Sequence, residues 1–505
     1  MSRSALITAV FLLVAAALIT PLRRDLFVGD ETKYGQVVRE MRSTGAFFLP
    51  TLNGTPFTHK PPIHFWLIDL LTFPLGVYSL WAFVLPSLAA FGFLLWLMWK
   101  MGGPLAAFLC GSSMMIWASA QSARMDVSFT ALIVLALWQL KRFFDGDDFR
   151  ALLWCGVVLG VAILIKGPMA PVIAIVLFAL EWWRRRGAPR GNYAPAILAM
   201  TLIPLLWFIP AMMLGGSAYT REVIVKQTVG RAIASWVHNA PPWFYVIHLP
   251  ATLFPWFFLA VVAIAALWRT HRFLVNWILA VVVPYSVMSS KLDVYMMAMI
   301  PPVALLIADY VQSWDRGRPA RRFAPGPAAN LIANSLILIL AIAGLFVSPN
   351  LIKGPEAALV QLPAVKMFCI VTALAAVIAL VITLRSSLTT STIATGLVPI
   401  VSMVFIAIAL MPLVNDLSST RPLVAALERQ SVAPEQMTLY ASPYLWTRDF
   451  PTKLALVVYG APATTKPTVI VTARAHASEI APSLAGYHVV DSVRMIGKWF
   501  DVYRR

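Results

Sequence analysis

Long apolar runs alternate with short polar segments from the N-terminus to about residue 411. Most of these runs approach the ~20 residues that an α-helix needs to cross a membrane. A further apolar helix at residues 63–76 is expected to dip into the membrane interface. The pattern therefore predicts about thirteen transmembrane helices, at residues 5–22, 80–98, 104–120, 127–140, 151–165, 168–183, 194–213, 245–268, 273–289, 294–311, 331–347, 365–384 and 393–411.

The pattern changes after residue 411. Short runs rich in β-formers alternate there with helical patterns at residues 421–429 and 475–484. We therefore expect a mainly α transmembrane domain at residues 1–411 and a small extracytoplasmic α/β domain at residues 412–505. The loop at residues 23–79 is expected to carry interfacial helices. Residues 5–22 have no convincing cleavage site before Pro21, which favours a retained first span over a signal peptide.

Composition supports a multi-span membrane protein. The chain is 60% hydrophobic and only 12% charged, with a mean hydropathy of +0.78. The net charge of +18 would suit nucleic acid, but much of it lies in short loops between predicted spans. We therefore expect no nucleic-acid partner. The three cysteines all fall within predicted spans and form no disulfide or metal pattern.

Charge also predicts the orientation of the chain. Alternate short loops are dense in Lys and Arg, and such loops face the cytoplasm. An odd number of spans then places the C-terminal domain outside the cytoplasm. The basic loops contain Lys100, Lys141, Arg142, Arg150, Arg184, Arg185, Arg186, Arg190, Arg269, Arg272, Arg316, Arg318, Arg321, Arg322 and Arg385.

The opposite, extracytoplasmic loops hold most of the unusual polar residues. Ionisable groups near hydrocarbon cost roughly 2.5–3.5 kcal/mol each at mid-helix. A chain that gathers them on one face is expected to use them together. The candidates are Asp30, Glu31, Tyr34, Lys60, Arg124, Asp126, Lys166, Arg231, Lys291 and Tyr295.

Two adjacent carboxylates, Asp30 and Glu31, precede an amphipathic helix at residues 32–42. Its apolar stripe begins at Tyr34, so the helix should lie in the membrane plane. Both acids are candidate catalytic groups. As an alternative, Asp30 is a good N-cap and Glu31 suits a first helical turn. The two readings are compatible, because capping would fix the carboxylate.

The other candidates also have ordinary explanations. Arg124 and Asp126 could divide the work of acid–base chemistry with Asp30, or form a local ion pair. Lys60, before two prolines, suits a phosphate group, although Lys60 and Lys166 could equally snorkel to the interface. Further alternatives are a solvated Arg231 and interface anchors at Lys291 and Tyr295.

Two extracytoplasmic histidines, His59 and His238, could meet in space, although their spacing is not that of a metal site. A divalent cation therefore stays an open alternative. No organic cofactor is indicated.

Several motifs resemble one family. The segment DETKY, followed by REM and LNGTPFTHKPPIHFW, is similar to the bacterial lipid A 4-amino-4-deoxy-L-arabinose transferases. These are grouped with the protein O-mannosyltransferases in the GT-C class of membrane glycosyltransferases. The likeness continues through ARMD at residues 123–126, KGP at 166–168, PPWFY at 241–245 and SSKLDVY at 289–295.

The resemblance implies a GT-C-like domain in the inner membrane of a bacterium and a polyprenyl-phosphate sugar donor. It also implies that the active site and the C-terminal domain are periplasmic. It implies that Asp30 is the main catalytic carboxylate and that Asp126 is its partner. Lys60, Arg231 and Tyr295 would contact the donor phosphate, with Lys291 as a further candidate. Glu31 is kept as a catalytic candidate, and Tyr34, Arg124 and Lys166 as further site residues.

The predicted function is therefore an inverting glycosyltransferase, expected to act as a monomer. It would move a sugar from a polyprenyl phosphate to an extracytoplasmic lipid or glycan, with lipid A as one candidate. A protein O-glycosyltransferase is a related alternative. A transporter or flippase of lipid-linked sugars, or a membrane scaffold, are the alternatives from other classes.

Overall fold

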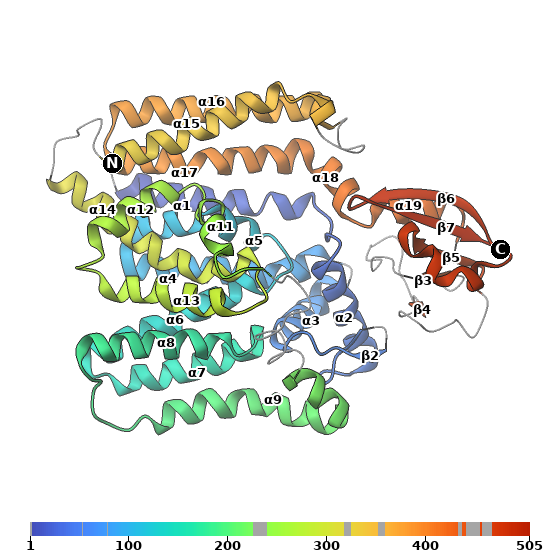
Figure 1. Cartoon of the computed structure of the whole chain (residues 1–505), viewed down its shortest axis with the longest axis horizontal. Coiled ribbons are helices and arrows are strands. Elements are labelled where there is room, and N and C mark those ends of the chain that lie inside the picture. The colour runs from blue at the N-terminus through green and yellow to red at the C-terminus, as the bar shows by residue number, and fades with distance from the viewer. Residues whose placement is uncertain are drawn as a thin grey trace.

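A computed structural model describes residues 3–52, 54–77, 79–225, 240–317, 325–351, 359–432, 437–440, 455–456 and 467–505. Most long helices run side by side in one bundle (Figure 1). At one end of this bundle lie α2 (Asp30–Thr44), α3 (Ile63–Leu75) and a small sheet domain, and we call this end the site face. The opposite end, where the N-terminus lies, carries the basic loops and is called the basic face. The mainly helical, multi-span membrane fold is therefore as predicted.

The helices in the first half of the bundle coincide with the predicted apolar runs. Gly103 has a positive φ of 79° and breaks the longest helix just after Lys100, where the sequence predicted a basic loop. The helices here are α1 (Arg3–Ala17), η1 (Thr20–Leu22), α4 (Leu80–Gly111), α5 (Met114–Ala120), α6 (Asp126–Gly146), α7 (Phe149–Lys166), α8 (Met169–Arg185) and α9 (Ala194–Arg221).

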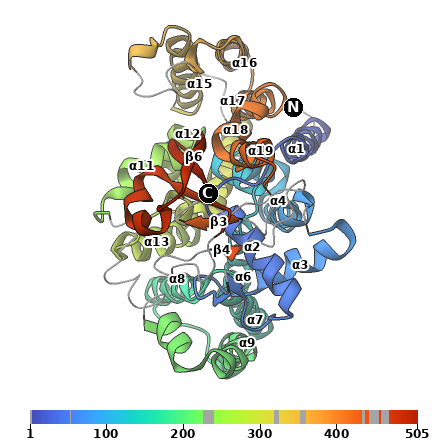
Figure 2. The ribbon, with the colours of Figure 1, turned by 90° about the vertical axis from the view of Figure 1, so that its right-hand side faces the viewer.

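The second half adds a bent helix pair and a three-helix group. The pair α11 and α12 meets at an angle of 108°, and α15 to α17 lie together at one side of the bundle (Figures 1 and 2). The helices are α11 (Phe244–Thr252), α12 (Phe257–Leu267), α13 (Arg272–Val287), η3 (Asp293–Met299), α14 (Ile300–Gly317), α15 (Pro325–Leu345), η4 (Pro349–Leu351), α16 (Pro363–Arg385), α17 (Leu388–Phe405) and η6 (Ile406–Leu410).

The number of spans is lower than the predicted thirteen when helix length and hydropathy decide. Within the described ranges, nine helices are long and apolar enough to cross a membrane, or ten if the bent pair is one span. Two predicted spans became helices of 17 and 16 residues, α8 and α13. Two others were joined across the break at Gly103 in α4. The surplus therefore comes from short helices and from one broken helix.

The interfacial region packs into the protein more deeply than its sequence pattern suggested. The stripe of α2 that includes Tyr34, Val37 and Met41 is 0–2% exposed and joins the main core. It packs on α3 beside a short antiparallel hairpin, in which the two-residue strands β1 (Thr51–Leu52) and β2 (Thr55–Pro56) pair. The predicted apolar stripe exists, but it faces protein rather than lipid.

The C-terminal region forms a mixed five-stranded sheet in the order β4-β3-β5-β7-β6. Strand β3 is parallel to β4 and β5, whereas β7 is antiparallel to β5 and β6. The sheet has a core of its own. Its elements are α18 (Met411–Ser418), α19 (Arg421–Arg429), β3 (Met437–Tyr440), β4 (Ala455–Leu456), β5 (Val469–Ala473), η8 (Arg474–Leu484), β6 (His488–Met495) and β7 (Lys498–Arg504).

Hydrogen bonds attach the first loop to the start of this region. The Asp25 amide donates to Asn415 Oδ1 at 3.0 Å, and Asn415 Nδ2 donates to the Arg23 carbonyl at 2.9 Å. The Asp25 carboxylate also pairs with Arg421 at 3.0 Å. The loop that leads to Asp30 is thus held by residues far along the chain.

Candidate functional site

Asp30 begins α2 at the site face. The capping position is Gly29, whose φ of 122° suits glycine, and no side chain caps the helix. The Asp30 carboxylate instead points to two cations. Its oxygens lie 3.5 Å from Lys33 Nζ and 3.3 Å from Arg124 Nη2. The alternative in which Asp30 serves as the N-cap is therefore wrong.

A chain of ion pairs links Asp30 to the interior. Arg124 reaches Asp30 on one side and, through Nε at 3.2 Å, Asp126 Oδ2 on the other. Asp126 also accepts a hydrogen bond from Lys166 Nζ. The Asp126 side chain is 5% exposed, whereas those of Asp30 and Arg124 are 38% and 37% exposed. The array thus runs from an accessible carboxylate to a buried one.

Lys60 belongs to the same electrostatic cluster. Its charge stabilises the Asp126 carboxylate, together with the charges of Lys166 and Arg124. Asp30, Lys60 and Asp126 are far apart in the sequence, and α2, the loop before α3 and the start of α6 bring them together. Their predicted convergence is what the structure shows.

A cavity of about 620 Å³ opens beside this cluster. Lys60, Lys166 and Tyr295 line it at its polar end. Tyr295 stacks on Tyr285 with ring centroids 5.1 Å apart, and Lys166 Nζ lies 5.1 Å from the Tyr295 ring centroid. The remaining walls are largely apolar, and they include Leu164, Val172, Leu205, Trp207, Phe208 and Ile224. The cavity thus has cationic side chains at one end and apolar walls elsewhere.

Glu31 has a different environment from that of its neighbour. Its side chain is 6% exposed and accepts hydrogen bonds from the Phe27 amide at 2.8 Å and the Ala123 amide at 2.6 Å. It also pairs with the buried Arg24. Glu31 therefore joins the first loop, α2 and the segment that carries Arg124, and it has little room for a substrate.

Two buried rings fill the space behind Asp30. Tyr34 packs edge-on against His64 and Phe65, at centroid distances of 6.1 and 5.3 Å. Burial raises the pKa of Tyr34 well above its usual value, and the charges of Asp30 and Asp126 raise it further. Burial lowers the pKa of His64 to about 4. At neutral pH, Tyr34 is therefore a protonated phenol and His64 a neutral imidazole.

The remaining predicted residues fall elsewhere. Lys291 is buried, donates to the Met288 carbonyl and lines a separate small cavity with Pro241 and Val287. Burial lowers the pKa of Lys291. Arg231 and His238 lie outside the described residues. His59 lines the 620 Å³ cavity, and the described part of the chain contains no group of three His, Cys, Asp or Glu residues that could hold a metal ion.

Three residues of the site region were not among the predicted site residues. In the sequence, Arg24 is an ordinary basic residue just after a predicted span. Only its burial in the structure reveals the ion pair with Glu31. His64 lies within the KPPIHFW motif, and its place in that motif was a signal that could have identified it. Tyr285 sits inside a predicted span, where a tyrosine gives no signal until the fold places it under Tyr295.

Comparison with known proteins supports the resemblance predicted from the motifs. Residues 59–208 match the family described as dolichyl-phosphate-mannose-protein mannosyltransferase. The fold matches that of ArnT from Cupriavidus metallidurans, solved in complex with undecaprenyl phosphate. The TM-score is 0.76 at 17% identity, and the match covers 99% of this chain and 98% of that one. The chain therefore shares the fold of a membrane protein that binds a polyprenyl phosphate.

Curated relatives are similar in sequence over about two thirds of the chain. The chain is 28% identical, over 63% of its length, to undecaprenyl phosphate-alpha-4-amino-4-deoxy-L-arabinose arabinosyl transferase 1 of Pseudomonas fluorescens. It is 24% identical to the corresponding transferase of Serratia proteamaculans over 68% of its length. These matches span 59% and 64% of the two relatives. The resemblance to this group of transferases is confirmed.

Proposed function

We propose that this protein is a glycosyltransferase that takes a sugar from a polyprenyl-phosphate donor and passes it to a lipid acceptor at the site face. The observation that carries this proposal is the ion-pair array of Asp30, Arg124, Asp126 and Lys166 at the edge of a cavity with apolar walls. A lipid phosphate needs cations for its head and hydrocarbon contacts for its tail. The match to a fold solved with undecaprenyl phosphate supports a donor whose sugar is linked to a polyprenyl phosphate.

The donor phosphate is assigned to the polar end of the 620 Å³ cavity. Lys60 and Lys166 supply ammonium groups there, and Tyr295 supplies a phenol. Arg231 stays a predicted contact, because it lies outside the described residues. The apolar wall formed by Trp207 and Phe208 would hold the first isoprene units. Lys291 is assigned an anchoring role, since its ammonium bonds to the backbone and lines another cavity.

The proposed reaction breaks the bond between the anomeric carbon and the phosphate oxygen. The electron pair of that bond leaves with the phosphate, and the acceptor oxygen attacks the same carbon. Lys60 and Lys166 stabilise the negative charge that grows on the leaving phosphate, which lowers the transition state more than the ground state. We expect inversion at the anomeric carbon from a single in-line displacement.

Asp30 is assigned to the acceptor. It is the accessible carboxylate of the array, and it can take the proton of an attacking hydroxyl or position a phosphate nucleophile. Arg124 holds it in place through the 3.3 Å contact. Asp126 is a positioning residue in this scheme, because its oxygens are occupied by Arg124 and Lys166. Glu31 is assigned a structural role, since it holds the first loop and the Ala123 segment against α2, and it takes no part in the chemical step.

The similarity to the aminoarabinose transferases makes undecaprenyl phosphate-aminoarabinose the first donor to test and lipid A the first acceptor. The test uses purified protein in proteoliposomes with donor and lipid A, and mass spectrometry of the lipids. We expect a mass increment of one pentosyl residue on lipid A, and loss of that product with Asp30→Asn while polyprenyl phosphate still binds. Movement of the donor between leaflets without any glycosylated product would support a flippase instead.

A divalent cation is a separate part of the proposal. His59 lies in the donor cavity, and a cation there would add positive charge beside the phosphate. The same transfer assay with EDTA, followed by restoration with Mg²⁺, Mn²⁺ or Zn²⁺, tests it. Transfer that is unaffected by the chelator would remove the cation from the scheme.

A further inference from the structure

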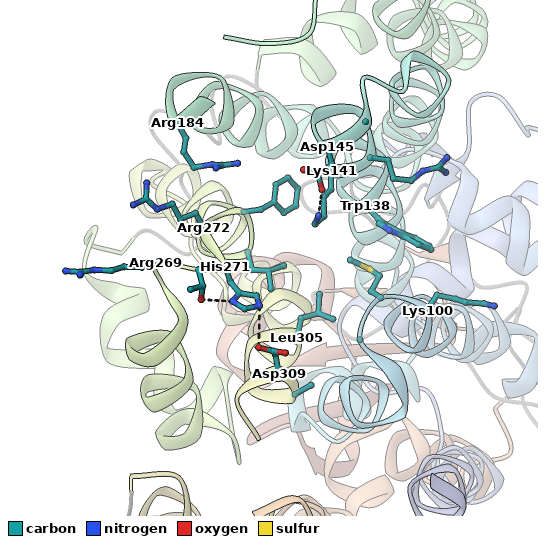
Figure 3. Close-up of a pocket in the computed structure, with 18 of the residues that line it drawn as sticks. Lys100, Trp138, Lys141, Asp145, Arg184, Arg269, His271, Arg272, Leu305 and Asp309 are labelled. Atoms are coloured by element: carbon teal, nitrogen blue, oxygen red, sulfur yellow. Dashed lines mark hydrogen bonds and ion pairs between the residues drawn. The ribbon is translucent and has the colours of Figure 1, made fainter. Parts of the chain in front are cut away.

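A large cavity lies at the basic face, at the far end of the bundle from Asp30. Its volume is about 1470 Å³, and it opens between the break in α4, the C-terminal ends of α6 and α8, the start of α13 and the middle of α14. Figure 3 shows side chains that line it. The proposed transfer reaction uses none of its residues. The cationic side chains that line it are Lys100, Lys141, Arg142, Arg184, Arg185, Arg269 and Arg272.

Positive charge exceeds negative charge in this cavity. Against its seven Lys and Arg residues it has three carboxylates, Asp145, Asp148 and Asp309. Asp145 pairs with Lys141 and with Arg185 at 2.6 Å, and Asp148 pairs with Arg142 at 2.7 Å. In the described part of the chain, Lys100, Arg269 and Arg272 have no carboxylate within 4.0 Å. Lys100 and Arg269 lie over the rings of Trp96 and Trp268, at 6.0 and 5.0 Å from the centroids. All three cations are exposed, so an anion from outside the protein can reach them.

A buried carboxylate holds one wall of the cavity in place. Glu181 is 0% exposed and accepts hydrogen bonds from Arg184 Nε at 3.1 Å, Arg185 Nε at 3.1 Å and Asn276 Nδ2 at 2.7 Å. Two adjacent arginines of α8 are thereby fixed to α13 through Asn276. A guanidinium whose position is already fixed loses less entropy when it binds an anion. Arg184 and Arg185 thus have fixed positions in the cavity wall, whereas Lys100, Arg269 and Arg272 are exposed.

The cavity lies at the level of lipid headgroups. Its walls are the ends of membrane-length or near-membrane-length helices, since α6 ends at Gly146, α8 ends at Arg185 and α13 begins at Arg272. Exposed tryptophans adjoin its cations in the sequence. Trp183 precedes Arg184 and is 77% exposed, and Trp268 precedes Arg269 and is 48% exposed. Tryptophan is typical of the membrane–water interface, so we expect lipid headgroups beside these two residues.

We propose that this cavity binds the phosphate headgroup of an anionic phospholipid from the leaflet at the basic face. Basic pockets between spanning helices on the cytoplasmic side suit such headgroups. Arg269, on the turn between α12 and α13, and Arg272, the first residue of α13, can bind a phosphodiester through their planar guanidinium groups. Lys100 approaches from α4, on another side of the cavity (Figure 3). The exposed tryptophans at the rim favour a lipid over a free phosphate.

The test measures lipid retention by native mass spectrometry and binding by titration of the full-length protein in detergent. Phosphatidylglycerol and cardiolipin are the probes, and phosphatidylcholine is the zwitterionic comparison. The variant Arg269→Gln with Arg272→Gln removes two charges from the cavity. The control, Arg316→Gln with Arg385→Gln, removes two exposed charges from the same face outside the cavity.

We expect the wild type and the control to retain anionic lipid, and the cavity variant to bind it about tenfold or more weakly. Equal weakening in the control, or equal binding of phosphatidylcholine, would overturn the proposal. Displacement of the lipid by an equal concentration of glycerol phosphate or inorganic phosphate would show a soluble anion to be the ligand. If the double variant fails to fold, Lys100→Gln measures the same cavity from another helix, and unchanged lipid binding there would count against the site.

Discussion

Adjacent carboxylates with separate tasks give the sharpest test of the site. Asp30 and Glu31 both begin α2, yet one faces the accessible ion-pair array and the other lies in the protein interior. We expect Asp30→Asn to abolish transfer and leave the fold intact. We expect Glu31→Ala to weaken the fold first, and activity only as a consequence.

The size of the Glu31 effect follows from its contacts. Arg24 is 7% exposed, and its guanidinium would be left buried without its carboxylate. Breaking a buried ion pair in this way costs about 3–5 kcal/mol. The amides of Phe27 and Ala123 also lose their acceptor, at 2.8 and 2.6 Å. The Asp30 contacts are longer and more exposed, so their loss changes stability by only about 0–1 kcal/mol.

The assay compares apparent Tm, binding of undecaprenyl phosphate and the rate of sugar transfer for both variants in the same detergent. Asp30→Asn should keep Tm and binding while transfer falls about 10²–10⁴-fold. Glu31→Ala should lower Tm, whereas the exposed Glu428→Ala on α19 serves as a control that changes nothing. An unchanged Tm for Glu31→Ala with a loss of transfer equal to that of Asp30→Asn would refute this division of roles.

Three further outcomes are expected. Lys60→Gln should weaken binding of undecaprenyl phosphate about 10–100-fold, measured by titration, while Lys366→Gln at the start of α16 should not. Lys166→Met should lower kcat at saturating donor by roughly 10²-fold, because one cation beside the leaving phosphate is lost, and an unchanged kcat would contradict its role. Hydrogen bonds from Arg474 hold the pKa of Asp501 below its usual value, although burial opposes this. The lowered pKa adds stability above the ordinary Asp pKa of about 3.9, and that stability is lost as the pH falls through the folded-state value. Asp501→Asn should therefore speed amide exchange in β5 and β7 at pH 7, with the difference from wild type vanishing in acid.

The sequence was most informative where one strong pattern dominated. Apolar runs predicted the membrane helices, because helices that cross a lipid bilayer need long stretches of apolar residues. The change in pattern after residue 411 predicted the mixed domain. The convergence of Asp30, Lys60 and Asp126 was also predicted, since charges near hydrocarbon are costly and were all on one face.

Other features were beyond sequence reasoning because they depend on packing. The environments of Asp30 and Glu31 differ although the residues are neighbours, and only the position of Arg24 and the Ala123 amide separates them. The break at Gly103 and the shortness of α13 make the number of spans smaller than predicted. Neither feature is visible in the hydropathy of the sequence. The large basic cavity needs parts of five helices to meet, which no local pattern encodes.

The attachment of the first loop to α18 and α19 has a consequence for biosynthesis. Asp25 and its partner Asn415 are 390 positions apart. At a synthesis rate of 5–20 residues per second, the ribosome reaches Asn415 about 20–80 s after it has made Asp25. The loop that leads to Asp30 thus emerges early and acquires its last contacts near the end of translation. A nascent chain released before that point would be inserted in the membrane but have an incomplete site face.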